Sequence, residues 1–116
     1  MASPIDDLYQ QGFQARANGD YGRARLFFDA VLAQDPNHLD TKHQLGLIQG
    51  FEGDFDGSLA TLQALSVQFP NNLEVKYDYA MTVMMLGDYD TGCRLLQEIL
   101  NVDPLHEKAL QQSAYC

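Results

Sequence analysis

The sequence predicts an all-α protein built from three antiparallel helix pairs. A motif of Gly, Asp and an aromatic residue begins at Gly19, Gly53 and Gly87, so that successive copies are separated by one constant interval. A proline follows each copy at the same interval, at Pro36, Pro70 and Pro104. A fixed period of this length is typical of repeat architectures. Hydrophobic residues make up 46% of the chain, which is enough for a packed core.

Each repeat unit divides into two helices. In the second unit the first helix runs over 39–52, and Gly53 closes it because glycine adopts positive φ readily. Asp54 is expected to cap the second helix, over 55–68, which ends before Pro70. The other units carry the same expected cap, at Asp20 and Asp88.

Helix signals also occur at both ends of the chain. Ser3 can cap the first helix, with Pro4 in its first turn and Asp6 three residues after the serine. The last segment, 106–116, is helix-forming and is expected to cover the apolar side of the third unit. We therefore expect seven helices and no strand, in a single domain over 1–116. Its units cover about 5–38, 39–72 and 73–106, followed by the terminal helix over 106–116.

Residues of similar size recur at matching offsets and predict the core. Small residues that allow two helices to approach closely are Gly12, Gly46 and Ala80 on the first helices and Ala24, Ser58 and Gly92 on the second. Large apolar residues follow helical spacing around them. They are Tyr21, Phe55 and Tyr89, then Phe28, Leu62 and Leu96, then Val31, Leu65 and Ile99.

These glycines, aromatic residues and prolines together resemble the tetratricopeptide repeat family, over about residues 4–116. Gln11 is a departure, because the family usually has a leucine there. The resemblance implies a right-handed superhelical solenoid of antiparallel helix pairs. It also implies a concave groove, lined by the first helix of each pair, that binds peptides or other proteins.

The candidate groove residues lie on the first helices, away from the packing positions. They are Tyr9, Phe13 and Arg16 in the first unit, His43 and Leu47 in the second, and Tyr77, Met81 and Met84 in the third. Aromatic residues and methionine are enriched in interface cores, which favours a binding surface. The alternative is that these residues pack between neighbouring helices.

An acidic rim is expected beside this groove. Asp6, Asp40 and Glu74 occupy one offset of the repeat, near the start of each first helix. Acids there offset the helix dipole, which is a sufficient explanation by itself. A row of acids beside apolar groups also favours an apolar peptide with basic flanks, held by salt-sensitive contacts.

The resemblance also covers co-chaperones that hold a C-terminal carboxylate with Lys, Asn and Arg. Here Tyr9 and Phe13 stand where that pattern needs Lys and Asn, and Asp78 lies near the position where the pattern needs an Arg. We therefore do not expect that ligand.

Composition excludes several classes of function. The formal charge of −9, from 16 acids and 7 bases, argues against nucleic-acid binding. No stretch approaches the ~20 apolar residues of a membrane span, and the N-terminal residues lack a signal-peptide pattern. The expectation is a cytoplasmic protein with free thiols at Cys93 and Cys116, since the spacing of the two cysteines does not favour a metal or redox pair.

No catalytic, metal or cofactor motif is recognisable in the sequence. We therefore expect a protein that is not an enzyme and needs no cofactor. Two functions remain open. One is a protein- or peptide-binding adaptor, or co-chaperone-like scaffold, that uses the groove. The other is a scaffold that self-associates through its ends or faces, with Leu110 and Ala114 half covered on the terminal helix.

Overall fold

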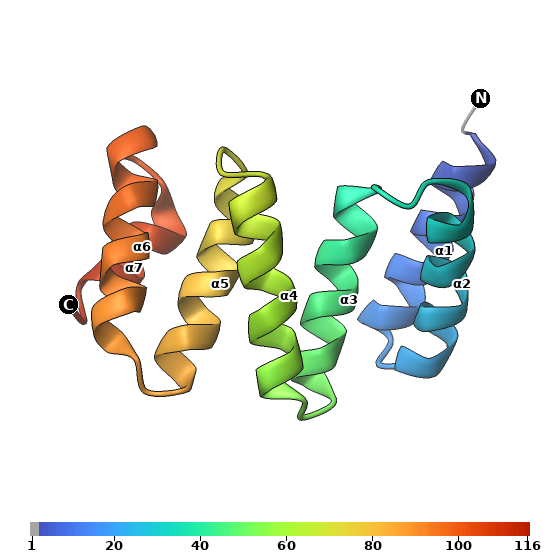
Figure 1. Cartoon of the computed structure of the whole chain (residues 1–116), viewed down its shortest axis with the longest axis horizontal. Helices are drawn as coiled ribbons and strands as arrows, with labels where there is room; N and C mark the ends of the chain where they lie inside the picture. The colour runs from blue at the N-terminus through green and yellow to red at the C-terminus, as the bar shows by residue number, and fades with distance from the viewer. Residues whose placement is uncertain (1–2) are drawn as a thin grey trace. The chain divides into compact units, whose positions relative to one another are not determined.

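Residues 3–116 are described by a computed structural model and form seven helices (Figure 1). The helices are α1 Pro4–Ala17, α2 Tyr21–Gln34, α3 Leu39–Phe51, α4 Phe55–Gln68, α5 Leu73–Met85, α6 Tyr89–Val102 and α7 Glu107–Ser113. No strand occurs within residues 3–116. The predicted all-helical fold is confirmed.

The chain divides into two compact units, which are described separately. Unit 1 extends to Asp54 and contains α1, α2 and α3. Unit 2 begins at Phe55 and contains α4, α5, α6 and α7. The expected second repeat therefore contributes one helix to each unit.

The turns within the helix pairs form as the sequence predicts. Gly19, Gly53 and Gly87 adopt φ of 80°, 90° and 96°, which residues with a side chain rarely adopt. After Gly19 and Gly87 the next residue caps the following helix, because the Asp20 and Asp88 carboxylates accept from backbone N–H groups three residues ahead, at 3.2 and 3.1 Å.

The first helices of the pairs also begin with side-chain caps. Ser3 and Asp6 form the expected capping box at the start of α1. His38, Asn72 and His106 cap α3, α5 and α7, each accepting from the backbone N–H three residues ahead at 3.3, 3.0 and 3.1 Å.

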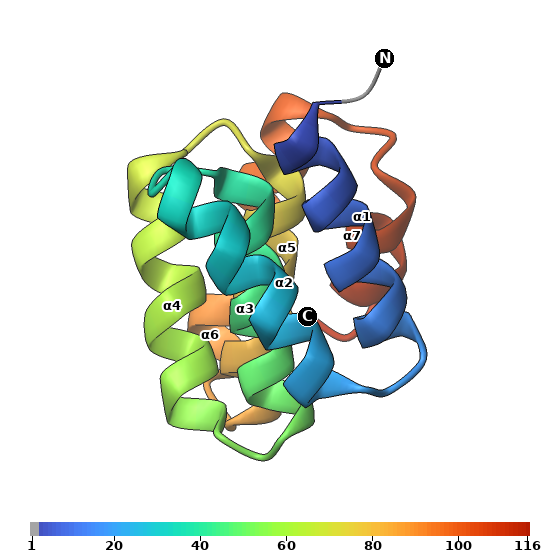
Figure 2. The same ribbon diagram turned by 90° about the vertical axis from the view of Figure 1, so that its right-hand side faces the viewer.

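Unit 1 is held together by the close approach of α1 and α2, which lie side by side in Figures 1 and 2. The ring of Phe28 lies where a Cβ on Gly12 would be, since such an atom would come within 2.5 Å of Phe28 Cε1. Ala24, Phe28 and Ile48 are fully buried around this contact. The small residue at Gly12 is therefore a requirement of packing.

Unit 2 has a larger core, formed by α4, α5, α6 and α7. Leu62, Ala80, Leu96, Ile99 and Ala109 are fully buried in it. Gly92 plays the part of Gly12 here, because a Cβ on it would come within 2.0 Å of Met84 Cγ. The expected small and large core positions, apart from the aromatic residue after each Gly-Asp, are all buried: Gly12, Ala24, Phe28, Val31, Gly46, Ser58, Leu62, Leu65, Ala80, Gly92, Leu96 and Ile99.

The aromatic residue after each Gly-Asp is less buried than predicted. Tyr21 is half-buried, while Phe55 is 40% and Tyr89 60% exposed. Each is the first residue of its helix. Helical spacing gives the face on which a side chain lies but not how far the opposing element extends.

The expectation of free thiols is wrong. Cys93 of α6 and Cys116 form a disulfide across 23 residues, with their Cα atoms 5.8 Å apart. The reason is tertiary, because α7 packs beside α6 and returns the end of the chain to Cys93. Spacing along the sequence carries no sign of this approach.

Candidate functional site

In unit 1, three of the predicted groove residues form one cluster on α1. The rings of Tyr9 and Phe13 lie 6.3 Å apart, centroid to centroid, and the Arg16 guanidinium carbon lies 4.8 Å from the centre of the Phe13 ring. All three side chains are half-buried, so each keeps a solvent-facing part. Helical spacing at i, i+4 and i+7 places them on one face.

Tyr9 is the member of this cluster that joins it to the core. Its ring lies 5.8 Å from Phe28 and 5.5 Å from the ring of His38. Burial raises the pKa of the Tyr9 phenol, and the charge of Asp40 raises it further, while Arg16 and a hydrogen bond from Gln44 act in the opposite direction. The predicted rim acid Asp40 therefore lies close enough to act on the cluster.

The Arg16 guanidinium lies over two aromatic rings. Its guanidinium carbon also lies 5.9 Å from the centre of the Phe51 ring, which stacks on Tyr21 at 5.7 Å. Within residues 3–116 its Nε is buried and has no hydrogen-bond partner. Cations over aromatic faces are attracted by the ring quadrupole, so the rings fix the position of this charge.

The remaining predicted residues of unit 1 lie in different settings. His43 and Leu47 of α3 are half-buried. Asp6 is exposed, and its carboxylate accepts from the Ser3 N–H at 3.4 Å in the capping box. Its role in starting α1 is therefore confirmed, whereas a role toward a ligand stays a prediction.

In unit 2, Tyr77 lies among residues that α7 supplies. Its ring is 6.0 Å from that of His106, and the Lys108 ammonium lies 5.7 Å from its centre. Burial raises the pKa of the Tyr77 phenol, and Lys108 acts in the opposite direction. Glu74, the third predicted rim acid, faces His106 Nε2 at 3.5 Å and Lys108 Nζ at 3.6 Å. The Lys108 ammonium therefore offsets part of the Glu74 charge.

The two methionines predicted for the groove differ in burial. Met81 is half-buried against the core of unit 2, and Met84 is only 8% exposed because it lies on Gly92. Both border a pocket of about 330 Å³, together with Met85, Tyr89, Gln112 and Tyr115. Met84 is thus mainly a core residue, with one part of its side chain in this pocket.

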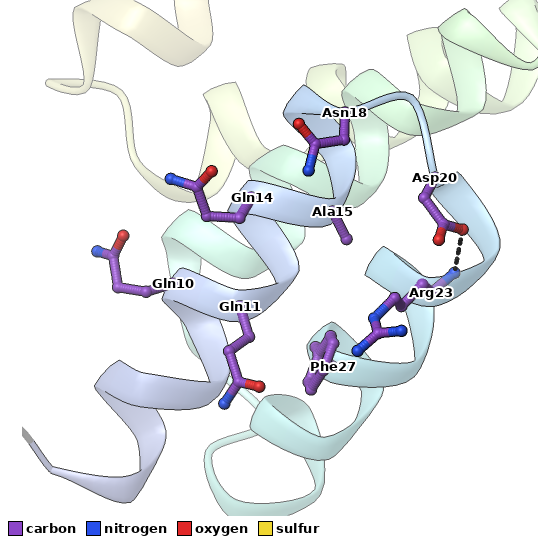
Figure 3. A pocket seen from close by; sticks show the side chains of 8 residues that line it. All are labelled: Gln10, Gln11, Gln14, Ala15, Asn18, Asp20, Arg23 and Phe27. Atoms are coloured by element: carbon purple, nitrogen blue, oxygen red, sulfur yellow. Dashed lines mark hydrogen bonds between the residues drawn. The ribbon is translucent and has the colours of Figure 1, made fainter.

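A larger cleft of about 510 Å³ lies on unit 1 and contains none of the predicted residues. Figure 3 shows its lining from α1, α2 and the turn between them, which is Gln10, Gln11, Gln14, Ala15, Asn18, Asp20, Arg23 and Phe27. Gln11 and Ala15 on α1 face Arg23 and Phe27 on α2 (Figure 3). Gln11, the departure from the family pattern, is one of the three glutamine side chains that line this cleft.

The chain resembles known proteins in part of its sequence and in its fold. A tetratricopeptide repeat model matches residues 8–38. The structure of MamA residues 41-end from Desulfovibrio magneticus RS-1 is 25% identical, with a TM-score of 0.79, and the match covers 96% of this chain and 63% of that one. Residues 8–38 thus match the tetratricopeptide repeat family, and the fold of the chain is that of solved tetratricopeptide repeat structures.

Two further structures share the fold of this chain. YrrB, described as having an unusual peptide-binding site, is 18% identical with a TM-score of 0.80, covering 97% of this chain and 58% of its own. An O-GlcNAc transferase mutant from Thermobaculum terrenum is 20% identical with a TM-score of 0.83, covering 97% and 22%. The chain spans less than two thirds of the length of each of these three structures. No curated protein matches its sequence.

The repeat register also identifies residues that the sequence-based prediction did not include. The predicted rows of groove and rim positions end with the third unit, although α7 and the residues after it provide fourth members. One repeat further along the chain, Glu74 corresponds to Lys108, Tyr77 to Gln111 and Met81 to Tyr115. Continuing the rows would have predicted both the lysine beside Glu74 and the tyrosine in the methionine-lined pocket.

Two classes of site are absent from residues 3–116. No group of three or more His, Cys, Asp or Glu residues there could hold a metal ion. None of the helices in this part of the chain is both long and apolar enough to cross a membrane.

Proposed function

We propose that this chain is a non-catalytic adaptor, or co-chaperone-like scaffold, that binds a peptide segment of another protein. In unit 1 the ligand contacts the cluster of Tyr9, Phe13 and Arg16, together with His43 and Leu47 of α3. Unit 2 offers a separate candidate contact surface at Tyr77 and Met81. The observation that carries the proposal is the unit 1 cluster, in which two aromatic rings and a ring-held cation share one partly exposed face.

Physical chemistry supports a protein ligand at this cluster. Aromatic residues and arginine dominate the binding energy of protein interfaces, because they bury large areas at low entropic cost. The buried core beneath Tyr9 holds its ring in place, so little side-chain freedom is lost on binding.

The ligand is apolar with basic flanks in this proposal. In unit 1 the acids that would attract a basic flank are Asp6 and Asp40, and both are exposed. In unit 2 the neighbouring Lys108 reduces the attraction of Glu74 for a basic flank. The basic flank therefore lies against unit 1, and its exposed pairs contribute ~0.2–1 kcal/mol each.

A cytoplasmic location completes the proposal. Disulfides in that compartment are mostly transient or redox-sensing. The Cys93–Cys116 bridge would then alternate between oxidised and reduced forms rather than serve as a permanent staple.

Self-association is the second candidate function, and exposed apolar residues in unit 2 favour it. Val102, Leu105 and Leu110 are 68%, 81% and 45% exposed. Sedimentation of the purified chain over a range of concentrations tests this directly. A mass that rises with concentration, and falls for Leu105→Glu, supports assembly, whereas a constant monomer mass excludes it.

Selection of a phage-displayed random peptide library on the immobilised chain tests the adaptor proposal. We expect recovered peptides to be apolar with flanking Lys or Arg. Synthetic copies should bind more weakly as ionic strength rises, because screening weakens pairs between exposed charges. No enrichment, or enrichment of acidic peptides, would contradict the proposal.

A matched pair of variants locates the contact. Phe13→Ala removes a ring of the cluster, and we expect about a tenfold or greater loss of peptide affinity, which is typical of aromatic positions central to an interface. Gln10→Ala instead alters the cleft between α1 and α2, and should leave peptide affinity unchanged. Equal effects of the two variants on peptide affinity would show that the ligand does not bind at the cluster.

A further inference from the structure

The disulfide of unit 2 lies next to the methionine-lined pocket. Tyr89, at the start of α6, forms one part of the pocket's lining, and Tyr115 forms another. Cys93 lies four residues after Tyr89 on the same helix, and Cys116 directly follows Tyr115. The bridge therefore ties the segment that carries one tyrosine wall to the helix that carries the other.

Little else holds the end of the chain in this position. Helix α7 has seven residues, of which Ala109 is buried. Its first turn is anchored, because Lys108 and His106 meet Glu74. Tyr115, however, is 78% exposed, and its N–H donates to the Gln112 carbonyl within the same turn. A helix this short is marginal by itself, so the covalent bridge is the main restraint on Tyr115.

The two sulfur atoms differ in their access to a reagent. Cys116 is exposed, whereas Cys93 is half-buried and packs against the core of unit 2. Thiol–disulfide exchange begins when a thiolate attacks an accessible sulfur of the bridge. Cys116 Sγ is therefore the atom that a thiolate can reach.

We propose that Cys93–Cys116 is a thiol–disulfide exchange site, and that its reduction by a dithiol releases Tyr115 from the methionine-lined pocket. The first thiolate of the dithiol attacks Cys116 Sγ, which forms a mixed disulfide and expels the Cys93 thiolate. The second thiolate attacks the reagent sulfur and expels the Cys116 thiolate. Both cysteine thiolates take up protons. The pair gains two electrons and two protons, and the dithiol leaves as a disulfide.

Reduction then removes Tyr115 from the pocket lining that it shares with Met81, Met84 and Tyr89. An effect of reduction on peptide binding rests on the proposed function, because that function assigns Met81 to the ligand surface. The opening itself is independent of any peptide. It is therefore measured without one, so that failure of the exchange site and failure of the adaptor proposal are distinguishable.

Methionine-methyl NMR and hydrogen exchange test the opening. In protein carrying ¹³C at the methionine methyl groups, we expect reduction by dithiothreitol to shift the Met81 and Met84 signals. Amides of residues 108–116 should exchange about tenfold faster or more, as expected for a local opening. Brief treatment with glutathione followed by mass spectrometry should find the adduct on Cys116.

Two variants serve as controls. Tyr115→Ala removes the wall while the bridge stays intact, and should shift the same methyl signals in the oxidised protein. The double variant Cys93→Ser, Cys116→Ser should resemble the reduced protein with or without dithiothreitol. If methyl signals and amide exchange are the same in the oxidised and reduced wild-type protein, the release of Tyr115 is excluded. An adduct found mainly on Cys93 overturns the order of attack.

Discussion

At the residue scale, two helical glycines of unit 1 differ in whether an added side chain would meet neighbouring atoms. Gly12 of α1 faces the Phe28 ring, so an added Cβ would come within 2.5 Å of Cε1. Gly22 of α2 has no atom within 4 Å of the same added group. The two positions are both helical and differ in what opposes them.

We predict that Gly12→Ala destabilises the protein by ~1–3 kcal/mol, because the ring of Phe28 must move within a packed core. Gly22→Ala should be neutral or stabilise by up to ~1 kcal/mol, since alanine lowers the entropy of the unfolded chain. Urea unfolding followed by circular dichroism measures both. Equal urea midpoints for the two variants would show that the close α1–α2 contact at Gly12 does not contribute to stability.

The phenol of Tyr9 gives a prediction about pH. Its pKa is raised in the folded state, first by burial and then by Asp40. The folded state thus favours the neutral phenol, and this stabilisation is fully present below the unfolded pKa of about 10. It is lost as the pH rises through the higher folded pKa.

Tyr9→Phe should therefore flatten the loss of stability above pH ~10, because phenylalanine has no proton to release. Thermal melts across the alkaline range are the measurement. Tyr115→Phe, which changes an exposed phenol, is the matched control. An identical alkaline decline in Tyr9→Phe and in the wild type would show that Tyr9 does not contribute to it.

At the scale of elements, the caps of the first helices follow one row of the repeat. His38, Asn72 and His106 occupy the same offset in successive repeats and cap α3, α5 and α7. Histidine is an uncommon cap, but its Nδ1 can accept in place of an amide oxygen. The row shows that the repeat keeps the acceptor position while the residue type changes.

We expect His38→Ala to cost ~0.5–2 kcal/mol, since the N–H of Thr41 loses its partner. His38→Asn should keep the stability of the wild type, because asparagine already caps the equivalent helix at Asn72. Comparing melting temperatures of the two variants decides the matter. A loss of the same size in both would mean that the imidazole acts through its contact with Tyr9 instead.

At the scale of the whole molecule, the bridge in unit 2 restricts the unfolded chain. A disulfide that closes a loop of 23 residues stabilises by roughly 3 kcal/mol in the chain-entropy model. The double variant Cys93→Ser, Cys116→Ser should be less stable than the oxidised protein by about that amount. Chemical denaturation with and without dithiothreitol is the check. A wild type that is insensitive to dithiothreitol would show that the bridge does not contribute.

Part of the candidate site could be foreseen in the sequence, and part could not. The α1 face with Tyr9, Phe13 and Arg16 follows from helical spacing alone, and the three side chains do come together. The depth of Met84 does not follow from spacing, because it depends on Gly92 of another helix. The offset charge of Glu74 likewise depends on where α7 places Lys108.

Local chemistry was decided by the sequence itself: the constant repeat period, the positive φ of three glycines, the capping residues and the small residues at helix contacts. These features involve residues close together in the chain, or a pattern repeated at a fixed interval, so no long-range geometry is needed to infer them. The tertiary structure alone decided how deeply each groove side chain is buried, which side chains face Glu74, and that Cys93 bonds to Cys116. Those outcomes depend on the distance between elements far apart in sequence, which is set by the packing of α5, α6 and α7.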